Sequence, residues 1–128
     1  MKSRRRNTHL HQSFKHAISG FAYLMQSQRN PRYHSTASIV VFYLAFWLKV
    51  SIQEWAILIL AMSLVWALEA INTSCEKMLD MVSPRYSKRA KRVKDMAASA
   101  VLLVSIAATI AGLLILGPPL HDKVISFS

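Results

Sequence analysis

Three carboxylates and one amide recur at helical spacing where an apolar stretch of the chain ends. Glu69, Asn72, Glu76 and Asp80 follow one another at intervals of three and four residues. At about 100° per residue they fall at roughly 0°, 300°, 340° and 20° around a helix, which is one narrow face. Carboxylates in one row repel one another without a cation, and an ionisable group at membrane depth costs about 2.5–3.5 kcal/mol on insertion scales. The row therefore predicts a functional site.

A plainer interpretation is that Glu76 and Asp80 are solvated charges at a helix end, paired with Lys77 and its neighbours. That interpretation accounts for Asp80 taken alone. We favour a site because all four polar residues share one face.

The residue types in and near this row suit phosphoryl transfer. Carboxylate and amide oxygens are hard ligands of the kind that Mg²⁺ prefers. The next charged segment supplies Lys91, Arg92 and Lys94, which suit phosphate oxygens, beside Asp95. The deepest carboxylate, Glu69, is placed to accept a proton from a hydroxyl group in the membrane interface. Together these groups predict transfer from a soluble nucleotide to a lipid alcohol.

The composition predicts that a membrane surrounds these residues. Of 128 residues 53% are hydrophobic and 17% charged, the mean hydropathy is +0.28 and the formal net charge is +10. Basic blocks alternate with apolar blocks, a pattern of small integral membrane proteins and not of a soluble nucleic-acid module, so no nucleic-acid partner is expected. The single cysteine, Cys75, excludes an intramolecular disulfide framework. Three glycines are too few for a Walker A or protein-kinase glycine-rich loop.

The hydropathy pattern predicts an all-α membrane protein with an N-terminal amphipathic surface helix and three transmembrane helices. Apolar residues from Phe14 to Met25 recur at helical spacing, and Asn30-Pro31 is expected to end that helix. Gly117-Pro118-Pro119 is expected to end the last span. The expected single membrane domain, residues 1–128, comprises a basic segment with the surface helix (1–34), a first span (35–50), a second with a cytoplasmic extension (52–81) and a third (95–117).

Basic residues predict the orientation. Seven Lys and Arg residues precede the first expected span and seven lie between the second and third, which leaves only Lys49 and Lys123 for the other side. The positive-inside rule then places the N-terminus and the second loop in the cytoplasm and the C-terminus on the opposite side of the membrane.

The two charged segments resemble the signatures of a known family. Residues 69–76, Glu-Ala-Ile-Asn-Thr-Ser-Cys-Glu, followed by Asp80, resemble the signature E-A-x-N-[ST]-x-x-E-x-x-x-D of the small bacterial diacylglycerol kinase/undecaprenol kinase family. Residues 90–98 resemble its second signature, A-K-D followed by small residues. Residues 13–17 and 29–34 are similar to its surface helix and to the segment after it. The resemblance covers roughly residues 12–117.

This resemblance implies a homotrimer of three-span subunits with active sites shared between neighbouring chains, MgATP as donor and a lipid hydroxyl as acceptor. It implies Glu69 as the general base and Glu76 as a metal ligand. The residues implied to hold the nucleotide or its metal are His16, Gln28, Asn72, Glu76, Asp80, Lys94 and Asp95. Two of them depart from the pattern of the family, which usually has a metal-binding glutamate at the position of Gln28 and a tyrosine at the position of His16. A neutral amide oxygen can bind Mg²⁺, but it removes one negative charge.

Two questions stay open from the sequence. Both undecaprenol and diacylglycerol are acceptable acceptors, and the Ala-Ile-Asn-Thr wording at residues 70–73 looks more like the undecaprenol branch. The rival hypothesis is a small non-enzymatic transport or scaffolding membrane protein with Glu69 as a proton- or cation-coupled site.

Overall fold

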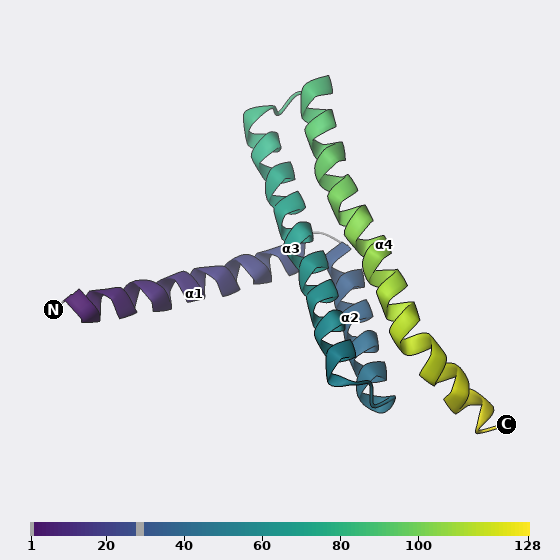
Figure 1. Ribbon diagram of the computed structural model, residues 1–128. Helices are drawn as coiled ribbons and strands as arrows, with labels where there is room; N and C mark the ends of the chain where they lie inside the picture. The colour runs from purple at the N-terminus through teal and green to yellow at the C-terminus, as the bar shows by residue number, and fades with distance from the viewer. Residues whose placement is uncertain (1, 28–29) are drawn as a thin grey trace.

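The computed structural model describes the backbone of residues 2–27 and 30–128, and the side chains of residues 9–27 and 30–128. The described residues form four helices: α1 (Lys2–Ser27), α2 (Asn30–Trp47), α3 (Ile52–Val82) and α4 (Lys88–Ile125). Figure 1 shows α3 and α4 side by side as an antiparallel pair, α2 along one half of α3, and α1 leading away from this bundle. The prediction of an all-α protein is confirmed.

A tight turn between α2 and α3 places these helices antiparallel. Lys49 adopts a φ of 53°, which reverses the chain direction just after α2. Ser51 then caps α3: its hydroxyl accepts from the Glu54 backbone N–H at 3.2 Å, and the Glu54 carboxylate accepts from the Ser51 N–H at 2.8 Å. This capping box satisfies two of the otherwise unpaired donors at the start of the helix.

Two helices in the described part of the chain, α3 and α4, are long and apolar enough to cross a membrane. Large apolar side chains on them, such as Leu60 and Leu103, are exposed around the bundle, as expected for surfaces that face hydrocarbon. The first third of α2 is polar, and this helix does not meet the same criterion. The three-span layout therefore stays a prediction.

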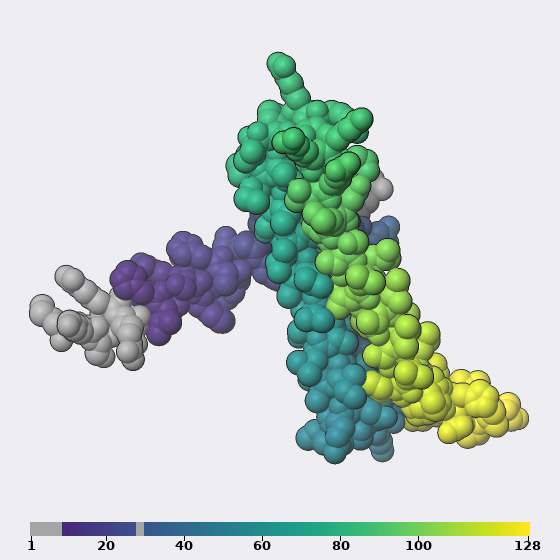
Figure 2. All heavy atoms as spheres, turned by 45° about the horizontal axis from the view of Figure 1, so that its top comes forward, coloured from purple at the N-terminus to yellow at the C-terminus, as the bar shows by residue number. Residues whose placement is uncertain are grey.

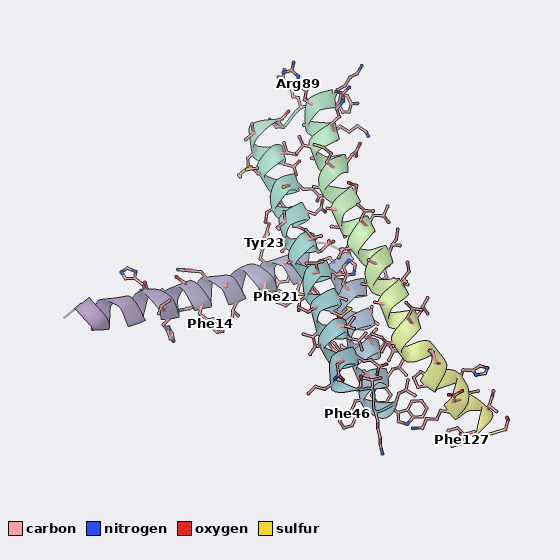
Figure 3. All side chains as sticks on the ribbon, viewed as in Figure 1. Phe14, Phe21, Tyr23, Phe46, Arg89 and Phe127 are labelled. Atoms are coloured by element: carbon pink, nitrogen blue, oxygen red, sulfur yellow. The ribbon has the colours of Figure 1, made fainter. Side chains whose placement is uncertain are left out.

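The small apolar core lies at the end of the bundle where α2 turns into α3. Its buried members are Ala45, Leu58, Ile115 and Leu116, against which Trp55 and other partly buried apolar side chains pack. Figure 3 shows Phe46 and Phe127 at this end and Arg89 at the opposite end of the α3–α4 pair. The candidate site residues of α3 lie toward the charged end.

Prolines lie at the start of one helix and inside another, and one predicted helix end was wrong. α1 ends at Ser27, close to its expected end, and Asn30-Pro31 begins α2, because proline has a helical φ and lacks only an N–H that the first turn would leave unpaired. Pro118 and Pro119 lie inside α4, which continues to Ile125. A proline inside a helix removes a hydrogen bond and favours a kink, but its φ remains compatible with a helix. The last helix also begins earlier than expected, at Lys88.

The amphipathic pattern of the N-terminal region forms a single long helix. The inner end of α1 packs on the bundle through Leu24, which is 5% exposed. Farther out, Phe14 and Ile18 are 70% and 56% exposed. Figure 2 shows this part of α1 extending from the bundle as a separate arm. The apolar face of the outer part therefore has no partner within the described part of one chain.

Candidate functional site

The deepest carboxylate of the polar row is completely enclosed. Glu69 in α3 is 0% exposed, and neither of its carboxylate oxygens has a hydrogen-bond partner among the described residues. The imidazole of His34 in α2 lies beside it, with Nε2 3.6 Å from Oε2 of Glu69. That separation is slightly too long for a hydrogen bond but close enough for strong electrostatic attraction when the imidazole is protonated. A buried carboxylate with unused acceptor capacity is available to a substrate proton.

One turn further along α3, two more polar side chains are buried. Asn72 is 5% exposed and Thr73 is 4% exposed, and the Asn72 Oδ1 and Thr73 Oγ1 atoms have no hydrogen-bond partner among the described residues. Unpaired buried polar atoms cost about 1–3 kcal/mol each, so they call for an explanation. Both oxygen atoms therefore remain available to hydrogen-bond a bound group.

Burial decreases along the predicted row toward the charged end of the pair. Glu69 and Asn72 are buried, Glu76 is half-buried, and the Asp80 side chain is 60% exposed. Asp80 lies eleven positions after Glu69, which corresponds to about 16 Å along the helix axis. The row therefore runs from an enclosed environment into solvent along one helix.

Trp66 joins three helices beside Glu69. Its ring lies 5.2 Å from that of Phe21 in α1 and 6.2 Å from that of His34 in α2, between centroids. Its Nε1 donates to the Ser38 hydroxyl of α2 at 3.2 Å. Figure 3 shows Phe21 and Tyr23 where α1 meets the bundle. This cluster positions His34 against Glu69.

His34 and Thr73 are the site residues that the sequence analysis did not select. His34 could have been selected from the sequence, because it lies in the segment 29–34 that resembles the family. Nothing local to α2, however, shows that it faces Glu69.

The second charged motif meets the outer end of the row. Lys94 in α4 donates to Asp80 in α3 at 2.7 Å, and this contact joins the two motifs across the helix pair. The Lys94 ammonium holds the pKa of Asp80, beyond the apolar part of α3, below its ordinary value. Asp95 accepts from Lys91 at 2.6 Å, one helical turn away on α4, and this pair is largely exposed.

One predicted nucleotide-binding residue, His16, is not brought to this row within one chain. His16 is exposed on the part of α1 that leaves the bundle. Gln28 lies outside the described residues. Over the residues that the structure describes, no three His, Cys, Asp or Glu side chains converge as a metal site. The chemistry of the donors nevertheless fits Mg²⁺, because Asn72 offers an amide oxygen without a partner and Glu76 a carboxylate on the same face of α3.

The fold and the site together define a small all-helical membrane protein with an acidic site near one end of its long apolar helices. Residues 15–116 match the family model described as prokaryotic diacylglycerol kinase. The undecaprenol kinase of Bacillus subtilis (strain 168) is 35% identical over 108 residues, which cover 84% of this chain and 88% of that protein. A diacylglycerol kinase of Synechocystis sp. is 41% identical over 109 residues, 84% of this chain and 62% of that protein.

The diacylglycerol kinase of Escherichia coli (strain K12) is 31% identical over 85 residues, 66% of this chain and 70% of that protein. The chain therefore belongs to the prokaryotic diacylglycerol kinase family. It is a lipid kinase, a phosphotransferase of the membrane. The rival hypothesis of a non-enzymatic transport or scaffolding protein is therefore rejected.

Proposed function

We propose that this protein catalyses ATP-dependent phosphorylation of a membrane lipid alcohol at the cytoplasmic surface of the bacterial inner membrane, giving the lipid phosphate and ADP. The acceptor is undecaprenol or diacylglycerol, the two lipids named in its relatives. The observation that carries the proposal is the enclosed Glu69 carboxylate with free acceptor capacity beside His34, at the apolar end of a polar row.

Glu69 is the general base in this proposal. Its carboxylate accepts the proton of the lipid hydroxyl as that oxygen attacks the γ-phosphorus of ATP, and the bond to the β,γ-bridging oxygen breaks with ADP as the leaving group. His34 orients the carboxylate and offsets part of the cost of burying its charge. Exclusion of water around Glu69 favours transfer to the lipid over hydrolysis.

The outer residues of the row and of α4 bind the nucleotide. Glu76 and Asn72 would hold Mg²⁺ through hard oxygen atoms, with Gln28 as a further ligand. The metal would neutralise charge on the phosphates. Lys94, with Asp80 and Asp95 beside it, binds phosphate oxygens or the metal, and His16 binds the nucleotide.

A homotrimer explains the unpartnered surfaces of one chain. The exposed apolar face of α1, with Phe14 and Ile18, needs a cover, and His16 lies on this arm away from the row. In a trimer, α1 of one subunit lies at the membrane interface against a neighbour and brings His16 to its row. The topology has the N-terminus and the α3–α4 loop in the cytoplasm and the C-terminus outside, with α2 as the first of three spans.

Transfer of labelled phosphate tests this function. Purified protein in lipid, given Mg²⁺ and ATP labelled on the γ-phosphate, is expected to label undecaprenol or diacylglycerol, and offering both lipids identifies the acceptor. Glu69→Gln keeps the shape and removes the base, so transfer is expected to fall about 10²- to 10⁴-fold while the oligomer persists. The matched control is Asp122→Asn, which alters an 84% exposed carboxylate near the other end of α4. Absence of transfer by wild-type protein, or unchanged transfer by Glu69→Gln, refutes the proposal.

Gln28→Glu separates a weak metal site from a wrong assignment. Restoring the negative charge is expected to lower the Mg²⁺ concentration needed for half-maximal transfer. An unchanged Mg²⁺ requirement removes Gln28 from the ligand set and leaves the role of Glu69 untouched.

A further inference from the structure

An apolar groove lies next to the candidate site, between the helices of one chain. A groove of about 420 Å³ lies between α2, α3 and α4. Residues that line it include His34, Val41, Met62, Ala108, Gly112 and Leu120. Apart from His34, Ser105 and Thr109 its lining residues are apolar, so its walls suit hydrocarbon.

The groove is continuous with the candidate site at one end. His34, which forms part of its wall, is the residue that lies 3.6 Å from Glu69. A chain lying in the groove therefore has its head beside the proposed base. At the opposite end, one turn beyond Leu120, Lys123 joins α4 to the end of α2. Its Nζ donates to the Trp47 carbonyl at 3.3 Å and lies 4.4 Å from the centroid of the Trp47 ring.

The volume suits one hydrocarbon chain. A methylene takes up about as much room as a water molecule in the liquid, on the order of 30 Å³, so the groove holds roughly fourteen methylenes. This volume therefore matches a single lipid tail.

Small side chains of α4 keep this space open. At Gly112 an added Cβ atom would meet no other heavy atom within 4 Å, and its φ is not in the left-handed region. A larger residue there would extend into the groove without straining the helix. The room for a ligand thus depends on residues that can be changed without disturbing the fold.

We propose that the groove between α2, α3 and α4 binds one hydrocarbon chain of the lipid acceptor and so positions its hydroxyl at Glu69, with Gly112 determining how far the chain can enter. This rests on the proposed function, since it places the tail of the acceptor in that reaction. Gly112 acts through the chain that it admits and is a specificity-determining residue, not a catalytic one.

The test compares Gly112→Leu with Ala107→Leu, an equally apolar addition at an exposed position of α4 outside the groove. Each variant is assayed with a long-chain acceptor, undecaprenol or dioleoylglycerol, and with a diacylglycerol of six-carbon chains. For Gly112→Leu, kcat/KM is expected to fall about tenfold or more with the long chain, because a misplaced hydroxyl reacts slowly. It should stay near the wild-type value with the short chain, and KM for ATP should not change. Ala107→Leu should resemble the wild type with both acceptors.

A binding readout keeps this inference separate from the reaction. A long-chain lipid alcohol with a photoreactive diazirine near its tail end is expected to label groove residues of α2 or α4, located by peptide mass spectrometry. Labelling should be lost in Gly112→Leu and kept in Ala107→Leu. Labelling elsewhere, equal labelling of the two variants, or an equal loss of activity with long and short chains refutes the groove. Groove labelling by wild-type protein that transfers no phosphate supports the groove and refutes the proposed function.

Discussion

The pairing of Glu69 with His34 allows a test in which the two residues are removed separately and together. His34→Ala leaves a carboxylate that is 0% exposed without the imidazole 3.6 Å away. Breaking a buried pair by removing one partner is destabilising because the remaining charge is uncompensated. We therefore expect His34→Ala to reduce both phosphate transfer and stability, provided that Glu69 is present.

The size of this effect follows from the distance. A protonated imidazole 3.6 Å from a carboxylate attracts it by about 5 kcal/mol at an effective dielectric constant of about 20. Desolvation of both groups offsets part of this energy, and residues in contact usually show coupling energies of roughly 0.5–3 kcal/mol. We expect a coupling of about 1–3 kcal/mol in the free energy of unfolding.

The assay is a double-mutant cycle of His34→Ala and Glu69→Gln. The free energy of unfolding in detergent and the residual lipid phosphorylation are measured for the wild type, both single variants and the double variant. In the Glu69→Gln background, His34→Ala should cost little, because no buried charge remains to be stabilised. Thr36→Ala is the control, since Thr36 is an exposed residue of α2 whose hydroxyl donates to the Arg32 carbonyl, away from the pair. Equal costs of His34→Ala in both backgrounds would refute the coupling.

Three further outcomes are expected. The double variant Asp80→Lys/Lys94→Asp should recover the thermal stability that either single variant loses. It should not recover phosphate transfer, because the side chain at position 94, which is proposed to contact phosphate, would then be negatively charged. Recovery of both properties would limit the pair to a structural role. Lys94 lowers the pKa of Asp80 from its ordinary value of 3.8, so the contribution of this pair to stability should be complete above about pH 4 and disappear as the pH falls through the lowered pKa. In a titration of the melting temperature against pH, Asp80→Asn should therefore reduce the pH dependence only at that acidic end. Trp66→Phe should cost about 1 kcal/mol of unfolding free energy through loss of the Ser38 hydrogen bond, measured by denaturant or thermal unfolding, and an unchanged stability would show that this bond contributes nothing.

The local part of the site could be predicted from the sequence, because helical periodicity alone decides which residues share a face. Glu69, Asn72, Glu76 and Asp80 lie along α3 as their spacing requires, with Glu69 and Asn72 buried. The contact of His34 with Glu69 could not be predicted in this way. It depends on how α2 packs on α3, which side-chain spacing within either helix does not encode.

The ion pair between α3 and α4 could not be predicted either, because it also depends on how two helices pack together. Lys94 and Asp80 are fourteen residues apart in the chain, and their 2.7 Å contact arises because the short loop after Val82 folds α4 back along α3. The predicted helix end at Pro118 was wrong for a different reason. Pro31 begins α2 because proline fits the first turn of a helix. Pro118 lies inside α4, because proline weakens a helix interior but keeps a φ that is compatible with a helix.

The depth of each residue along α3 explains why a single helix can serve two substrates from different phases. Glu69 is enclosed among apolar helices, whereas the Asp80 side chain, about 16 Å further along, is 60% exposed. A lipid hydroxyl cannot leave the membrane interface without exposing its chain to water, and a nucleotide cannot enter hydrocarbon without losing the hydration of its phosphates. The proposed reaction therefore has to occur where both substrates can reach one row of side chains. The proposed base at the buried end and the proposed phosphate-binding groups at the exposed end would meet this requirement without movement of either substrate into the wrong solvent.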